Sequence, residues 1–168
     1  MHHLKEFDKQ TSLKLKYKDN AYMLWILGLY IDESDLDALA SRSLTDGGND
    51  KCIDFMEIDK SGQKIVIAQG YFTQKASDKA PSSKASNINT AIAWLKHGNI
   101  DSKTINEKVR TRIIECREAI KSEEIEQIDI LYIHNLPESL NSEEELATCQ
   151  ISACSQFQNE EIAVTCRE

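Results

Sequence analysis

The chain has 168 residues, which is long enough for one sizeable hydrophobic core and short for two complete domains. Hydrophobic residues make up 40% of the sequence, charged residues make up 29% and prolines are few, a composition that argues against extensive disorder. The longest apolar run, residues 21–31, is too short for a membrane helix, which needs roughly 20 apolar residues. The polar start of the chain lacks the apolar core of a secretion signal, so we expect a cytoplasmic protein without membrane contact.

The net charge of -8 is distributed unevenly along the chain. Residues 123–168 hold 11 acidic residues and 1 basic residue, whereas residues 1–122 hold 17 acidic and 19 basic residues. The acidic segment is unsuited to nucleic acid, and we expect it to be either a solvated face or a contact with another domain or a second subunit. The near-neutral part can still carry a local phosphate-binding face.

The five cysteines are an odd number, and no two of them have the Cys-x-x-Cys spacing of a zinc site. This pattern suits reduced thiols better than a disulfide framework. A cysteine nucleophile needs a depressed pKa and a nearby base, and the sequence shows neither. We therefore expect the cysteines to act as small apolar residues and assign them no chemistry.

Two helices are expected at the start of the chain. The apolar stretch that Asn20 opens predicts a first helix of about three turns, and residues 32–34 break it. The leucines at positions 36, 39 and 44 predict a second, amphipathic helix. This helix should stop at the turn formed by residues 46–49, Asp-Gly-Gly-Asn.

A β-hairpin is expected next. Residues 52–58 and 64–72 have the composition of strands, and residues 59–62 form a short polar loop between them. The second strand contains the unbroken apolar run 65–68, which is typical of a strand that is buried on both faces. We therefore expect this strand to be central in its sheet.

The rest of the chain alternates helices and strands. Residues 73–84 are small, polar and basic and predict an exposed loop. The later elements expected from the apolar periodicity are helices over about 86–98 and 102–121, a strand over 128–133, a helix that starts near 142–145 and a last strand over 162–165. This order predicts one α/β domain over residues 1–168, with a helical lead-in (1–47) and a core (48–168) in which helices flank a central mixed sheet.

Two polar residues of the hairpin form a candidate metal site. Asp54 lies on the first strand and Gln69 lies late on the second strand, so the two side chains can stand side by side at one end of the sheet. Mg²⁺ prefers hard oxygen ligands on rigid elements, which a carboxylate and an amide carbonyl supply. Asp50 is more typical of a turn residue than of a ligand, and we treat it as a secondary candidate.

The same residues carry a resemblance to a known family. The run Gly48-Asn49-Asp50-Lys51-Cys52-Ile53-Asp54 followed by Ile67-Ala68-Gln69-Gly70-Tyr71 resembles the Mrr-type variant of the PD-(D/E)XK nuclease core. In that family an Ile-Asp on one strand is followed by Gln-x-Lys on the next. Residues 46–72 together with Ile133-His134-Asn135-Leu136-Pro137-Glu138-Ser139 resemble the N-terminal region of the abortive infection phage resistance (AIPR) family.

The resemblance implies a restriction-endonuclease-like fold and a role in bacterial antiphage, or antiviral, defence. It implies a nuclease, a hydrolase of DNA or RNA phosphodiesters that depends on magnesium (Mg²⁺) or Mn²⁺, with Asp54 and Gln69 as the metal-binding and catalytic residues. Proteins of the AIPR family are usually much longer, which would make this chain an N-terminal fragment of a longer protein.

One position departs from the family pattern. Tyr71 stands where the family has lysine, so an ammonium group would have to come from another part of the backbone. Lys84 and Lys75 are the candidates for this catalytic role, and Lys84 is favoured because it starts a helix that should cross the strand ends. The alternative is a catalytically inactive domain of the same fold that binds nucleic acid or a protein partner, because fold does not determine function.

Several other residues have structural as well as functional interpretations. His134 and Asn135 follow the third strand and suit a general base and a phosphate contact, but a capping or buried hydrogen-bonded role is more common for a lone histidine. The two tryptophans, Trp25 and Trp94, are expected in the core. A basic row along the helix over 102–121 is either a solvated face or a track for a phosphate backbone. Its members are Lys103, Lys108, Arg110, Arg112, Arg117 and Lys121.

Overall fold

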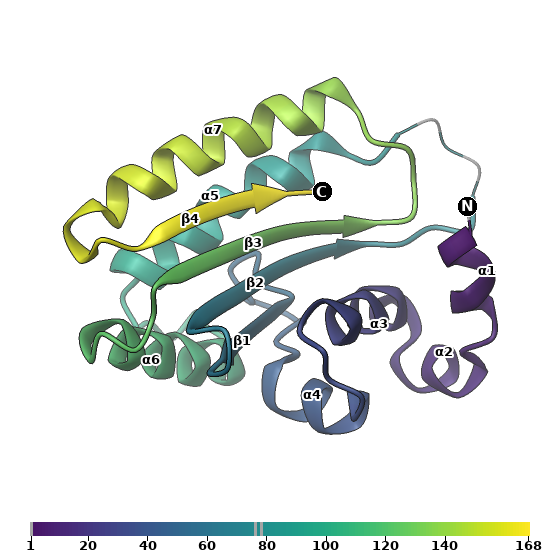
Figure 1. Cartoon of the computed structure of the whole chain (residues 1–168), viewed down its shortest axis with the longest axis horizontal. Helices are drawn as coiled ribbons and strands as arrows, with labels where there is room; N and C mark the ends of the chain where they lie inside the picture. The colour runs from purple at the N-terminus through teal and green to yellow at the C-terminus, as the bar shows by residue number, and fades with distance from the viewer. Residues whose placement is uncertain (1, 76, 78) are drawn as a thin grey trace.

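The computed structural model describes residues 2–75, 77 and 79–168 (Figure 1). The first helices are α1 (His2–Asp8), α2 (Thr11–Tyr17), α3 (Ala21–Tyr30) and α4 (Leu36–Ser43), with a 3-10 turn η1 (Lys18–Asn20) before α3. They are followed by β1 (Phe55–Asp59), β2 (Lys64–Tyr71), α5 (Ser82–His97), α6 (Glu107–Lys121), β3 (Gln127–His134), α7 (Leu140–Gln156), η2 (Gln158–Glu160) and β4 (Ala163–Arg167).

The four strands form one mixed sheet in the order β1-β2-β3-β4. The hairpin strands β1 and β2 are antiparallel, with Phe55 opposite Ala68, and the pairs β2–β3 and β3–β4 are parallel. The predictions of a hairpin and of an inner position for β2 are confirmed. The expected α/β class, with a mixed sheet flanked by helices, is also confirmed.

Two hydrophobic clusters cover the two faces of the sheet. The side chains of β2 alternate between them, because successive residues of a strand point to opposite faces. Ile65 and Ile67 pack with α5, α6 and α7, whereas Val66 and Ala68 pack with α1, α3 and α4. Figure 1 shows α1 to α4 on one side of the sheet and α5 and α7 on the other. Trp25 and Trp94 pack against these clusters, as expected.

Helix α3 approaches the end of β2 closely. A Cβ atom at Gly70 would lie 2.9 Å from the sulfur of Met23, which is nearer than real Cβ contacts occur. A side chain at this position would require the Met23 side chain to shift. Gly70 therefore allows the helical lead-in to pack directly over the strand end that carries Gln69.

The helix limits differ in part from the sequence expectations. Helices α1 and α2 lie within the expected helical lead-in (1–47) but are not predicted individually; α2 has no fully buried residue, and only Leu13 and Tyr17 of this helix pack partly against the core. Helix α5 begins at Ser82, earlier than expected, and α6 begins at Glu107, where the Asn106 side chain caps it by accepting from the Lys108 N–H. The exposed loop predicted over 73–84 includes Ala76 and Asp78, which lie outside the described residues.

None of the helices in the described part of the chain combines the length and the apolar character that a membrane crossing requires.

Candidate functional site

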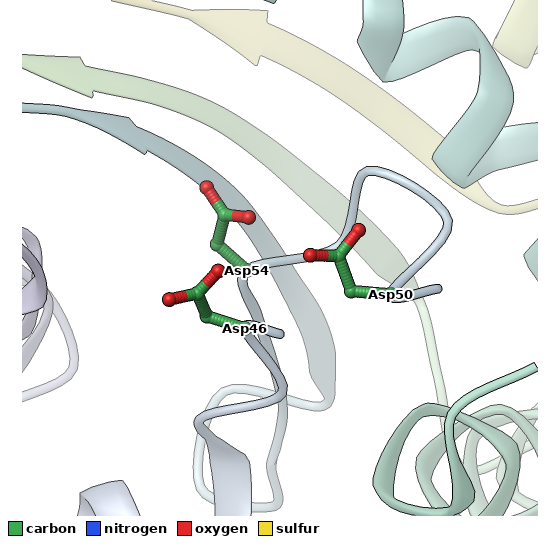
Figure 2. A group of neighbouring side chains, drawn as sticks. All are labelled: Asp46, Asp50 and Asp54. Atoms are coloured by element: carbon green, nitrogen blue, oxygen red, sulfur yellow. The ribbon is translucent and has the colours of Figure 1, made fainter. Parts of the chain in front are cut away.

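Three aspartates meet in the loop between α4 and β1. Asp46, Asp50 and Asp54 each offer a carboxylate oxygen, and these oxygens all lie within 4.8 Å of one another. Figure 2 shows the three side chains converging beside the end of β2. Asp46 is exposed, Asp50 is half-buried and Asp54 is buried. We call these three residues the aspartate cluster.

Backbone hydrogen bonds of Asp54 bring Asp46 and Asp54 together. Its carbonyl oxygen accepts from the N–H of Thr45 at 2.9 Å and from the N–H of Asp46 at 3.2 Å. Its own N–H donates to the Ala68 carbonyl at 3.1 Å, so Asp54 continues the hairpin pairing although β1 itself begins one residue later. The Asn20 side chain, at the start of α3, donates to the Asp46 carboxylate at 2.7 Å.

Asp50 has the turn role that the sequence indicates. Its carboxylate accepts from the N–H of Cys52 at 2.9 Å and from the N–H of Gly47 at 3.2 Å. The turn is tight, because Asn49, Lys51 and Cys52 all have positive φ values. The same turn directs the Asp50 carboxylate into the aspartate cluster, so the structural and the ligand interpretations are compatible.

The Asp54 carboxyl group is in an unusual electrostatic position. Burial raises its pKa to about 6, while the hydrogen bond from the Gly70 N–H and the positive charge of Lys84 act in the opposite direction. The negative charges of Asp46 and Asp50 raise the pKa further. The carboxylate accepts the Gly70 N–H at 2.8 Å. A bound cation would remove the repulsion within the aspartate cluster.

Gln69 lies next to Asp54 in the hairpin. The pairing of Phe55 with Ala68 makes the two residues neighbours across the strands, as expected. The Gln69 side chain is 3% exposed, and its Oε1 atom has no hydrogen-bond partner among the described residues. A buried carbonyl oxygen without a partner is energetically costly, so Gln69 Oε1 is available to accept a hydrogen bond or to coordinate a ligand.

The two candidate lysines lie in different environments. Lys84, in the first turn of α5, is half-buried, and its charge lowers the pKa of Asp54. Lys75 is exposed on the loop that follows β2 and is not among the main causes of that pKa shift. Tyr71 is the last residue of β2 and packs against the core on the α5 side. Of the two lysines, the structure brings only Lys84 into electrostatic contact with Asp54.

The residues at the end of β3 and directly after it have structural roles. The side chain of Asn135 accepts from the Thr73 N–H and donates to the Thr73 carbonyl, which fixes the start of the loop after β2. The Nδ1 atom of His134 accepts from the Leu136 N–H at 3.3 Å, and Nε2 lies 3.3 Å from the Glu168 carboxylate. The His134 side chain is thus buried and hydrogen-bonded at Nδ1, whereas its Nε2 has no hydrogen-bond partner among the described residues.

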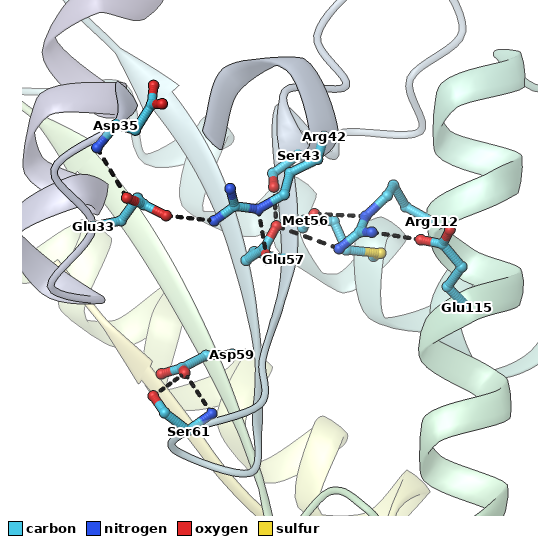
Figure 3. A network of polar contacts seen from close by, with 10 residues as sticks. All are labelled: Glu33, Asp35, Arg42, Ser43, Met56, Glu57, Asp59, Ser61, Arg112 and Glu115. Atoms are coloured by element: carbon cyan, nitrogen blue, oxygen red, sulfur yellow. Dashed lines mark hydrogen bonds and ion pairs between the residues drawn. The ribbon is translucent and has the colours of Figure 1, made fainter. Parts of the chain in front are cut away.

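The arginines of α6 are used inside the protein. Arg117 donates to three carbonyls at the end of α5, and Arg110 donates to the carbonyls of Ile100 and Ser102. Arg112 donates to the Met56 carbonyl and contacts Glu57 and Glu115 (Figure 3). Arginines held in this way do not form a free track for a phosphate backbone. That interpretation of the basic row is therefore wrong for its arginines.

A second buried aspartate, Asp129, differs from Asp54 because its carboxylate has several hydrogen-bond partners. Asp129, on β3, accepts from the Tyr30 and Thr165 hydroxyls at 2.7 Å each, and Lys64 lies 3.5 Å away. Burial acts to raise its pKa, but hydrogen bonds from Gln127, Thr165 and Tyr30 outweigh burial and lower the pKa. The Asp54 pKa moves in the opposite direction. This contrast points to the aspartate cluster as a place for a ligand.

Sequence reasoning missed Asp46. The one sequence signal is that Asp46, Asp50 and Asp54 follow one another at intervals of four residues, but in a loop this spacing does not predict that side chains meet. The hydrogen bonds of the Asp54 carbonyl bring Asp46 close, and the turn around Asp50 directs its carboxylate to the same place.

No protein-family model, curated protein or solved structure matched the chain.

Proposed function

We propose that the chain is a nuclease domain of the restriction-endonuclease-like class, which hydrolyses DNA or RNA phosphodiesters with Mg²⁺ or Mn²⁺ in antiphage defence. One observation carries the proposal: the aspartate cluster converges beside Gln69, whose buried Oε1 atom has no partner among the described residues. The defence role rests on the resemblance to the AIPR family in residues 46–72 and 133–139.

The donor set fits a hard divalent cation. Asp46, Asp50 and Asp54 supply carboxylates, and Gln69 supplies an amide carbonyl, which are the ligand types that Mg²⁺ and Mn²⁺ prefer. The Gly70 N–H donates to one oxygen of Asp54, and no hydrogen bond to the other oxygen occurs among the described residues. When bound, a divalent cation supplies charge neutralisation at the phosphate and lowers the pKa of a bound water.

The protein side chains contribute positioning and charge. Lys84 is on α5, and its charge acts on Asp54. Its ammonium can therefore contact a phosphate oxygen next to Asp54 and replace the lysine that the family has at position 71. The rigid hairpin register holds Asp54 and Gln69 in place before any substrate binds. Exposed Lys75 and Lys79, on the loop after β2, are suited to flanking phosphates.

Metal binding and nuclease activity test the proposal together. We expect Mn²⁺ to bind the purified chain in a calorimetric titration and to support degradation of DNA or RNA. Asp54→Asn should weaken Mn²⁺ binding at least roughly tenfold and abolish cleavage, because it removes a charged ligand. Lys84→Met should leave Mn²⁺ binding within about twofold and lower the cleavage rate by roughly 100-fold or more, because it removes only charge stabilisation of the reacting phosphate.

Asp101→Asn is the matched control, because Asp101 is an exposed aspartate outside the cluster. It should behave like the parent protein in both assays. Cleavage that survives Asp54→Asn unchanged would mean that the activity arises at another site or from a contaminant. Full activity of Lys84→Met would disprove the role assigned to Lys84.

The inactive-domain alternative is favoured by one observation, the partly buried Tyr71 in the place of the family lysine. In that case nucleic acid should bind in the presence of EDTA with an affinity that falls as salt rises, and Mn²⁺ should support no cleavage. Gel-shift and cleavage assays on the same samples separate the two functions.

A further inference from the structure

Helix α7 carries an unpartnered apolar stripe. Its buried residues, among them Leu146, Cys149 and Ala153, pack inward. Its outer face presents Leu140, which is 76% exposed, and Ile151, which is 74% exposed. These two residues are 11 positions apart and thus lie on the same side of the helix, about 16 Å from each other.

Two smaller residues continue this line. Ala147 and Cys154 are exposed and stand seven and 14 positions after Leu140, which places them on the same side of α7. We call Leu140, Ala147, Ile151 and Cys154 the α7 stripe. In Figure 1, α7 lies along the side of the molecule that is remote from α1 to α4. Exposed apolar side chains aligned in this way are a common feature of docking surfaces.

Acidic groups border the α7 stripe. Glu143 and Glu144 are exposed next to it on the helix. A hollow of about 430 Å³ adjoins the stripe, and its lining includes Ala147, the carboxylates of Glu138, Glu143 and Glu168, and one basic residue, Arg167. The surrounding segment 123–168 has 11 acidic residues and 1 basic residue. The surface therefore combines an apolar line with a negative rim.

We infer that the α7 stripe docks a basic amphipathic helix of a partner protein, with its apolar residues on the stripe and its lysines or arginines facing Glu143 and Glu144. Helix-in-groove recognition uses apolar anchors at this spacing, and opposite charges at the rim select the partner. A second copy of the chain is disfavoured, because a twofold contact would bring together two copies of the segment 123–168, each with 11 acidic residues and 1 basic residue. The negative rim also repels nucleic acid.

A synthetic helical peptide of leucines and lysines is the probe. Fluorescence anisotropy, measured with the full chain in EDTA, should show one peptide bound per chain and an affinity that falls as salt rises. Leu140→Ser and Ile151→Ser should each weaken binding by roughly tenfold, because each removes one buried anchor. The two positions are exposed, so circular dichroism should show that both variants fold like the parent.

Leu29→Ser is the matched control, because Leu29 is also exposed, at 66%, but belongs to α3. It should bind the probe like the parent, and a peptide with glutamates in place of the lysines should not bind. The inference is wrong if Ile151→Ser binds normally, if Leu29→Ser is equally weakened or if both peptides bind alike. The inference would also be overturned if sedimentation showed that the parent is a dimer and that Ile151→Ser dissociates it. Such a result would assign the α7 stripe to a second copy of the chain. EDTA keeps this test independent of the proposed metal site.

Discussion

Two buried aspartates of one sheet differ in how their charge is balanced. Asp129 receives hydroxyl hydrogen bonds from α3 and β4 and lies near Lys64, and its pKa is lowered. Asp54 receives one backbone N–H and has two other carboxylates beside it, and its pKa is raised to about 6. The charge of Asp129 is therefore balanced by groups of the protein itself. The negative charge around Asp54 would be balanced by a bound cation.

The raised pKa of Asp54 predicts how the stability of the metal-free protein depends on pH. The folded chain binds this proton more tightly than the unfolded chain, whose carboxyl has its ordinary pKa of 3.8. The resulting stabilisation is complete below about pH 4 and is lost as the pH rises through about 6. It amounts to about 3 kcal/mol in the free energy of unfolding.

Urea unfolding in EDTA, for the parent and for Asp54→Asn, measures this effect. Between about pH 4 and about pH 7 the parent should lose up to about 3 kcal/mol relative to the variant, which cannot ionise at position 54. Parallel pH profiles for the two proteins would show that Asp54 titrates normally. Mn²⁺ should reverse the loss, because metal binding requires the ionised carboxylate.

At the scale of elements, β1 is an edge strand that is held by helices of both layers. Glu57 is 7% exposed and accepts from Ser43 and Arg42 of α4, and Arg112 of α6 reaches it from the other side (Figure 3). Arg112 also donates to the Met56 carbonyl at 3.0 Å. Side chains that cover an edge strand also protect it from pairing with other chains.

Replacing Arg112 should therefore destabilise the fold. Arg112→Leu leaves Glu57 with one arginine fewer and removes a donor from the Met56 carbonyl, so we expect a loss of about 2 to 3 kcal/mol in urea unfolding. Lys108→Leu, at an exposed position of the same helix, should cost less than about 0.5 kcal/mol. Equal effects of the two changes would mean that the network around Glu57 contributes little.

At the scale of the whole molecule, the aspartate cluster is tied to both helical layers. Asn20, before α3, donates to Asp46, whereas the N–H of Asn106, before α6, donates to the Asn49 carbonyl. Lys51 stacks over Trp94 of α5 with its ammonium 5.0 Å from the ring centre. A cation that orders this loop therefore stabilises contacts on both sides of the sheet.

Bound metal should stabilise the entire chain. Mn²⁺ at about 100 times its dissociation constant should raise the free energy of unfolding by about 2.7 kcal/mol. Thermal unfolding followed by circular dichroism should show a higher midpoint with Mn²⁺, the same higher midpoint for Asp101→Asn and a clearly smaller rise for Asp54→Asn, whose site binds Mn²⁺ more weakly. An unchanged midpoint for the parent at saturating Mn²⁺ would contradict a preformed site.

The sequence by itself determined the α/β class, the hairpin and the inner position of β2, because apolar periodicity and turn residues act over a few neighbouring positions. It also indicated that Asp54 and Gln69 are neighbours, since a short hairpin sets the register. Tertiary structure alone decided the rest. The entry of Asp46 into the cluster and the internal use of Arg112 and Arg117 depend on hydrogen bonds between distant segments, which no local pattern encodes.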